Sequence, residues 1–137
     1  MNVRALQRLF PESEIAGLEI NENAALPAFA SVLPEAGHNE IVGWPAAREL
    51  GRFGVVLLED PRANPRNRLR TELTGELVEA GAEVVLHASA RGATRLERLV
   101  SLVLLGDLVS IYLAVLRGED PVDIGPLDTL KAALARR

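Results

Sequence analysis

"FGVVLLEDPRANPRNRLRTELTGELVEAGAEVVLHA", residues 53–88, carries the strongest structural signal in this 137-residue chain. It begins and ends with valine- and leucine-rich runs, Phe53–Glu59 and Ala82–Ala88, that do not alternate apolar with polar residues. Such runs are typical of parallel strands that are covered on both faces. Between them, leucines recur every four residues at positions 69, 73 and 77, and Gly81 stands where a helix would end. The stretch therefore predicts a strand–helix–strand unit with a right-handed crossover.

The residues after this unit predict one long helix, Ala93–Arg117, which ends at Gly118. It is apolar on nearly every side over Leu99–Leu116. A membrane span is disfavoured because Asp107 stands in the middle, where a charge costs roughly 2.5–3.5 kcal/mol on insertion scales. We therefore expect a helix buried on all sides by pairing with a second subunit. Asp107 and Ser110 are then expected to make polar contacts across this homodimer seam.

Three shorter helices are expected elsewhere in the chain. One is "PAFASVL", Pro27–Leu33, which Pro34 would end, and another is "AARELG", which Pro45 would open. Asp120 and the proline after it break the chain before a last helix, Leu127–Arg136. The expected fold class is thus α/β with three layers, a small parallel sheet between helices, in a single domain.

Composition narrows the range of functions. The formal net charge is −4 and the pI is near 5.2, which disfavours nucleic acid or an anionic membrane as a partner. The absence of cysteine excludes thiol catalysis and thiolate metal sites, and two isolated histidines are a poor basis for a zinc site. The opening Met1–Phe10 lacks the apolar core and cleavage site of a signal peptide. A soluble, cytoplasmic protein is expected.

Two polar motifs, "NEN" around Glu22 and "GHNE" around His38, are the candidates for chemistry. A glutamate can move a proton between adjacent sugar carbons through an enediolate, and a histidine can assist ring opening at the ring oxygen. On the residues alone, simpler interpretations are favoured. Glu22 would be a solvated carboxylate near a helix terminus, and His38 a helix-end histidine bonded to backbone.

Other candidates favour structural roles. Four arginines follow the first strand at its carboxyl end, where ligands of open α/β sheets bind, so a phosphate site is an option there. Acidic residues lie close by, and a salt-bridged surface helix is the favoured interpretation. For His87 a core histidine bonded to backbone is favoured. The arginines are Arg62, Arg66, Arg68 and Arg70.

The stretch "NENA…PAF…LPE…HNEIVGW" closely resembles the C-terminal half of bifunctional phosphoglucose/phosphomannose isomerases, which are sugar-isomerase (SIS) domain enzymes. The likeness continues through "LLEDPRANPRNRLR" and "ARGATRLERLVSLVLLGDLVSIYLAVLRGEDP". It covers about Ile20 to Leu134, and it implies that residues 1–137 form one partial, C-terminal type SIS domain with a flavodoxin-like three-layer fold.

The resemblance also implies roles for residues. Glu22 would be the base that moves the proton between C1 and C2. His38 would open the sugar ring and reach into the site of the neighbouring subunit, with Asn39 and Glu40 positioning it or sealing its helix. Asn39 and Arg62 are candidate substrate-binding residues. The implied reaction converts glucose 6-phosphate or mannose 6-phosphate to fructose 6-phosphate, with no metal and no redox cofactor.

The chain also departs from the family's pattern. Phosphate cradles need clustered Gly, Ser and Thr, and no such loop is found. The strand and glycine turn expected before "NEN" are replaced by Met1–Ile20. We therefore expect part of a longer enzyme or a shortened relative, with the phosphate grip supplied from elsewhere. The alternative function is a non-catalytic SIS-like module that dimerises or binds a phosphosugar. A flavodoxin-like nucleotide binder is disfavoured because no glycine fingerprint is present.

Overall fold

The computed structural model describes residues 20–136, so the amphipathic opening Met1–Phe10 lies outside the described residues. Residues 20–23 are helical. The elements that follow are α3 (Ala36–Asn39), the 3₁₀ helix η1 (Glu40–Ala46), α4 (Ala47–Leu50), β1 (Gly54–Glu59), α5 (Pro65–Val78), β2 (Val84–Ser89), α6 (Arg95–Arg117) and α7 (Gly125–Leu134).

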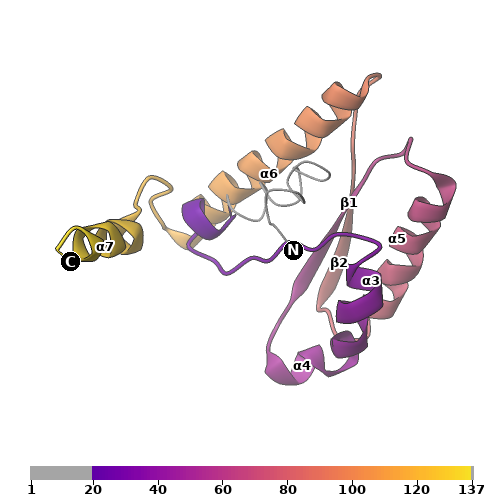
Figure 1. Cartoon of the computed structure of the whole chain (residues 1–137), viewed down its shortest axis with the longest axis horizontal. Coiled ribbons are helices and arrows are strands. Elements are labelled where there is room, and N and C mark those ends of the chain that lie inside the picture. Colours follow the sequence, from indigo (N-terminus) through magenta and orange to yellow (C-terminus); the bar gives the residue numbers. More distant parts are fainter. Residues whose placement is uncertain (1–19, 137) are drawn as a thin grey trace.

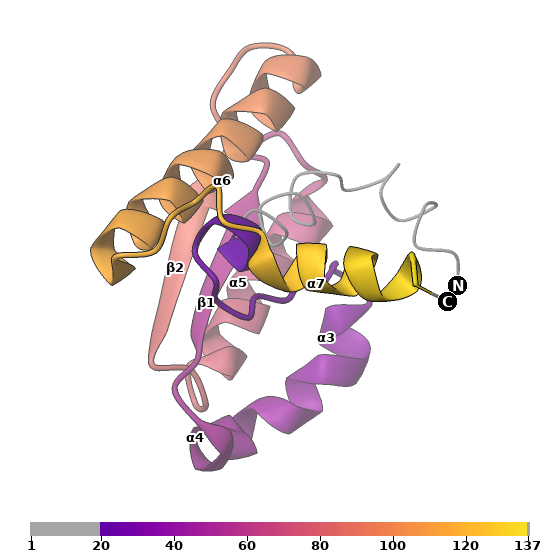
Figure 2. The same ribbon diagram turned by 90° about the vertical axis from the view of Figure 1, so that its left-hand side faces the viewer.

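The strand–helix–strand unit is confirmed. β1 and β2 pair in parallel, with Gly54 opposite Val84 and Glu59 opposite Ser89. Asn64 caps α5, because its side chain accepts a hydrogen bond from the backbone N–H of Arg66. In Figures 1 and 2, α5 covers one face of the strand pair and α6 covers the other. These three layers confirm the α/β fold class with a small parallel sheet.

The long helix α6 is confirmed within two residues of its expected start. Thr94 and Glu97 form a reciprocal capping box at its N-terminus, and Gly118 ends it in the left-handed conformation, at φ 72°. One face is buried against the rest of the chain, at every fourth position: Arg98, Leu102, Gly106, Ser110 and Ala114.

The other side of α6 is exposed in the single chain, so the expected burial on all sides is not met within one copy. Leu104, for example, is 54% exposed, and Val100 and Leu108 on the same side are also exposed. By length and composition alone, α6 is the one helix among residues 20–136 that could cross a membrane. The mostly buried core helix of a soluble protein passes the same test, and in the single chain 22% of the apolar stretch of α6 is buried.

The expected helix Pro27–Leu33 is wrong, because residues 25–32 form no helix. The Asn21 side chain makes both possible hydrogen bonds to the backbone of Ala28: its Nδ2 donates to the carbonyl at 2.8 Å, and its Oδ1 accepts from the N–H at 3.1 Å. These bonds take the peptide groups that a helix would need, and they hold the segment open. After it, η1 runs through Pro45 and α4 begins at Ala47, so the helix expected after Pro45 is found at shorter length.

The last helix, α7, is also found where it was expected. In Figure 1 it stands away from the body of the domain, beyond the far end of α6. None of its residues is buried, and Leu127, Leu130 and Leu134 are exposed.

The core of the described region is small. Its buried apolar side chains are mostly alanines, joined by Val78 and Leu102. Larger side chains of the sheet remain exposed, Val56 by 55% and Leu86 by 53%. Apolar surface of this kind on a strand pair indicates a contact with further protein.

Candidate functional site

Glu22 lies exposed on the helical turn 20–23, and its neighbour Asn23 fixes this turn to α6. Asn23 Nδ2 donates to Ser110 Oγ at 2.8 Å, and Ser110 is fully buried. Arg117 adds a second link, because its Nε donates to the carbonyl of Ala24 at 3.1 Å. A carboxylate on this turn is therefore exposed to a ligand while its backbone is held in place.

The expected place of Ser110 at a dimer seam is wrong. Its hydroxyl is enclosed within the chain, where it accepts from Asn23 and donates to the carbonyl of Asp107 at 2.7 Å. The physical reason is that Ser110 lies on the buried side of α6, four residues after Gly106.

His38 lies exposed in the last turn of α3. Its imidazole makes no hydrogen bond with any part of the chain that the structure describes, so the expected backbone partner is not found. α3 packs beside α5, since a Cβ added at Gly37 would lie 3.7 Å from Thr74 Oγ1. The imidazole is thus presented to solvent on the α5 side of the sheet.

The chain does not bring Glu22 and His38 together. The turn 20–23 sits against α6, on one face of the sheet, whereas α3 sits with α5 on the other face, and both views show this separation (Figures 1 and 2).

The neighbours of His38 do not hold its ring. The Glu40 carboxylate accepts from Ser31 Oγ at 2.7 Å through both oxygens, which ties η1 to the segment before α3. Asn39 is exposed, and its side chain does not cap η1. Glu40 therefore does not position the His38 ring, which was one of its two expected roles. Asn39 remains accessible to a ligand.

Arg62 joins the loop after β1 to the loop before α6. Its Nη1 donates to the carbonyl of Ala93 at 2.8 Å, and the same carbonyl accepts from Arg98 Nη1 at 3.1 Å. Arg98 Nε lies 2.8 Å from Asp60 Oδ1, a charge contact without hydrogen-bond alignment. These bonds join the loops at the carboxyl ends of the strands, and they use one N–H group of Arg62, which stays exposed.

The other arginines of the group do not form the expected salt bridges. Arg70 Nη1 donates to Asn67 Oδ1 at 2.8 Å, and none of the four makes an ion pair within residues 20–136. The surface of α5 is therefore less neutralised than its sequence suggests.

The backbone just before α6 is capped by Glu97, a residue of the first turn of the helix. The Glu97 carboxylate accepts from the backbone N–H groups of Ala93 at 2.6 Å and Thr94 at 3.1 Å. These hydrogen bonds lower the pKa of Glu97 below its ordinary value. The sequence analysis missed this role, although "TRLE" carries the pattern of a capping box.

His87 has a carboxylate partner instead of the expected backbone partner. Its Nδ1 lies 2.5 Å from Glu59 Oε1. Its other ring edge lies over α5, since a Cβ at Gly75 would be 3.4 Å from Nε2 and 3.0 Å from Leu57 Cδ1. His87 therefore faces α5 beside Gly75, but its side chain is 49% exposed, so the expectation of a core histidine is wrong.

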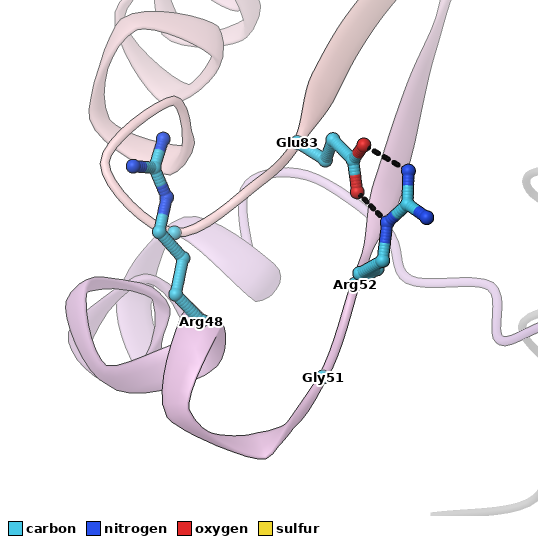
Figure 3. A pocket seen from close by; sticks show the side chains of 5 residues that line it. Arg48, Gly51, Arg52 and Glu83 are labelled. Atoms are coloured by element: carbon cyan, nitrogen blue, oxygen red, sulfur yellow. Dashed lines mark hydrogen bonds and ion pairs between the residues drawn. The ribbon is translucent and has the colours of Figure 1, made fainter.

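A shallow hollow of about 380 Å³ opens at the amino ends of the strands (Figure 3). Arg52 and Glu83 form a two-bonded ion pair on its wall, which raises the pKa of Arg52 and lowers that of Glu83. Arg48 donates to the carbonyls of Glu79 and Ala82, both at 3.3 Å. Both arginines are engaged, and residues 20–136 hold no cluster of three metal-ligating side chains.

A parallel strand pair between two helical layers, with an exposed glutamate and an exposed histidine on its two sides, defines an SIS-type α/β domain. Residues 16–134 match the family described as the bacterial phospho-glucose isomerase C-terminal SIS domain. The chain belongs to this family.

Similar proteins carry a consistent name. The chain is 40% identical over 118 residues to a bifunctional phosphoglucose/phosphomannose isomerase of Caldicellulosiruptor bescii, covering 85% of this chain and 35% of that protein. It is 35% identical to the protein of the same name from Aquifex aeolicus, covering 86% of this chain and 37% of that protein. The crystal structure of a glucose-6-phosphate isomerase like protein from Thermus thermophilus superposes with a TM-score of 0.67 at 26% identity, covering 88% of this chain and 38% of that one. The chain thus spans little more than a third of the length of these proteins.

Proposed function

We propose that this chain is the C-terminal part of a phosphosugar aldose–ketose isomerase that converts glucose 6-phosphate or mannose 6-phosphate to fructose 6-phosphate. The Glu22 carboxylate removes the proton from C2 of the open-chain aldose and returns it to C1 of the enediolate. His38 moves the proton at the ring oxygen when the sugar ring opens. The exchange needs no redox partner, because the substrate and the product are isomers.

The placement of Glu22 is the observation that carries the proposal. A general base must be exposed to the substrate and held in position. Glu22 is exposed, and the bond from Asn23 Nδ2 to the buried Ser110 Oγ fixes its turn on α6. The family match and the names of the relatives support a sugar phosphate as the substrate class.

The separation of Glu22 and His38 supports an active site that is shared between copies. His38 of one copy would reach the site that contains Glu22 of another copy. The exposed apolar side of α6, with Val100, Leu104 and Leu108, is a surface on which a homodimer could form. A dimer contact there would also bury the second apolar side of α6, as expected for a helix that is apolar on nearly every side.

We infer that residues 20–136 do not supply the whole phosphate site. Within this part of the chain, Arg62 Nη1 donates to the carbonyl of Ala93, and the Glu97 carboxylate accepts from the N–H groups of Ala93 and Thr94 just before α6. We therefore propose that another segment or another chain supplies the phosphate grip. Residues 1–137 act as a single domain of that assembly, in a cytoplasmic setting, with Asn39 beside the substrate.

The test is a coupled assay for glucose 6-phosphate formed from fructose 6-phosphate. It compares this chain with a form that is extended upstream in its gene. Activity that is confined to the extended form, and that Glu22→Gln abolishes while Glu49→Gln does not, supports the proposal. A stable dimer with no activity in either form would instead indicate a non-catalytic SIS-like module.

A further inference from the structure

The residue before the proposed base closes a loop with its side chain. Asn21 Nδ2 donates to the carbonyl of Ala28 at 2.8 Å, and its Oδ1 accepts from the N–H of the same residue at 3.1 Å. The side-chain amide thus pairs with both polar groups of Ala28, and it ties the two ends of residues 21–28 together. Asn21 and Glu22 are both exposed, so this closure lies beside the carboxylate at the protein surface.

The closed loop contains a strained backbone position. Ala25 has φ 49°, and it is the one non-glycine residue with positive φ within residues 20–136. In this left-handed region the Cβ atom of an alanine comes too close to the following carbonyl oxygen, whereas glycine adopts the conformation freely. Such a conformation persists only where the surrounding contacts enforce it, and strained positions of this kind cluster at active sites. Ala25 stands three residues after Glu22.

Hydrogen bonds on both sides of Ala25 enforce this conformation. Before it, the side chain of Ala24 is fully buried, and the carbonyl of Ala24 accepts from Arg117 Nε at 3.1 Å. After it, the two bonds from Asn21 hold Ala28. The first restraint is anchored on α6, whereas the second depends on one exposed side chain. Loss of the Asn21 amide would therefore free the loop and let the φ of Ala25 return to the negative range.

We propose that Asn21 positions the Glu22 carboxylate by holding Ala25 in its left-handed conformation, an inference that rests on the proposed function of Glu22 as the base. The bond from Asn23 to Ser110 anchors the turn 20–23 on α6, but a single anchor leaves rotation about it. The closure by Asn21 is a second anchor, on the other side of Glu22 in the chain. Asn21 is thus a positioning residue, because it acts on the reaction only through the direction in which the base leaves the turn.

The first test separates positioning of the base from substrate binding. In the extended, active form, Asn21→Ala should lower kcat about tenfold to a hundredfold, because a small displacement of a catalytic group has effects of this size. KM should stay within about threefold, because a general base acts mainly in the transition state. The matched control is Asn67→Ala, which removes another exposed asparagine with a hydrogen bond inside the chain and should change neither constant.

A second substitution tests the role of the strain at Ala25. Glycine accepts the left-handed conformation without a steric cost, so Ala25→Gly removes the reason for the loop to relax when the Asn21 amide is lost. Adding Ala25→Gly to Asn21→Ala should therefore raise kcat at least about threefold above that of Asn21→Ala alone. The control is Ala30→Gly, an exposed alanine of the same segment without positive φ, which should give no recovery. Recovery by neither glycine, or equally by both, would overturn the proposal.

Hydrogen exchange of the Ala28 amide, followed by NMR on this chain, measures the closure without an activity assay. Asn21→Ala should speed this exchange at least about tenfold, with an unchanged circular dichroism spectrum, and Asn67→Ala should not. Equal exchange rates would overturn the proposal for Asn21. So would a wild-type kcat for Asn21→Ala in the extended form when Glu22→Gln is inactive. An extended form that is inactive, or one in which Glu22→Gln keeps full activity, would instead contradict the proposed function, and the inference would fall with it.

Discussion

Asn23 Nδ2 donates a hydrogen bond to Ser110 Oγ across 2.8 Å, and this bond joins residues that are 87 positions apart in the chain. It fixes the turn that carries Glu22 to the middle of α6. Ser110 also donates to the carbonyl of Asp107, so its hydroxyl serves as both acceptor and donor in a fully buried place. The position of the proposed base thus depends on a residue of the long helix.

Replacing Ser110→Ala should lower the free energy of unfolding by about 1–2 kcal/mol, because the bond from the Asn23 amide to the hydroxyl is lost. Urea denaturation measures this loss. The control is Thr129→Ala, which removes an exposed hydroxyl that donates within α7. An effect of Ser110→Ala no larger than that of the control would show that the link between Asn23 and Ser110 contributes little.

Gly81→Ala should be strongly destabilising. A Cβ at this position would lie 1.7 Å from the carbonyl oxygen of Trp44, a backbone atom that cannot move without shifting η1. We expect a loss of about 1–3 kcal/mol or more, the range for overpacking. Thermal or urea unfolding measures it against Gly43→Ala, where a Cβ would meet nothing within 4 Å. Equal stability of the two variants would contradict the close approach of Gly81 to Trp44.

The cap of α6 predicts a pH dependence with a definite sign. The pKa of Glu97 is lowered in the folded chain by the N–H groups of Thr94 and Ala93. Its stabilising contribution is therefore complete above the unfolded-state pKa and is lost as the pH falls through the lowered folded-state pKa. The stability difference between the wild type and Glu97→Gln should be largest near neutral pH and should shrink in acid.

Urea midpoints of the two proteins, measured from about pH 7 down to about pH 3.5, test this sign. The exposed Glu49→Gln serves as the control. A difference that grows as the pH falls would contradict the role of the Glu97 carboxylate.

Leu104→Glu should dissociate a dimer formed through α6. The side chain is 54% exposed and lies on the side of α6 opposite the buried Gly106, so a charge there would face the partner surface. Sedimentation should show a shift from dimer to monomer with an unchanged circular dichroism spectrum. Leu130→Glu, on the exposed side of α7, is the control and should leave the assembly intact. If the wild-type protein is already a monomer, the proposed dimer through α6 is contradicted.

Local signals predicted much of the fold. The valine-rich runs indicated β1 and β2, although the expected cover on both faces is not met within the single chain, and Gly118 marked the end of α6. The false helix at Pro27–Leu33 had plausible local signals, but the Asn21 side chain takes the Ala28 peptide groups. That competition depends on the backbone path and is not visible in residue spacing.

The sequence suggested Glu22 and His38 as site residues, which stays a prediction, and it did not predict how they are arranged. The motifs around Glu22 and His38 identified both side chains, and both are exposed. Their separation depends on the face of the sheet on which each segment lies. The spacing of apolar residues along the sequence does not show which face that is. The role of Ser110 was missed for a related reason, because α6 is apolar on both sides and its buried side could not be told from the exposed one.

The main proposal is that Glu22 and His38 act together only between two copies, and mixing two inactive variants is its sharpest test. Glu22→Gln and His38→Ala are prepared separately in the extended, active form, then dissociated, mixed and reassociated. We predict that each variant alone is inactive and that the mixture recovers about a quarter of the wild-type isomerase activity, because half of the dimers are mixed and each holds one intact site of two. A mixture no more active than its parents, although mixed dimers form, would show that both residues serve a site within one copy.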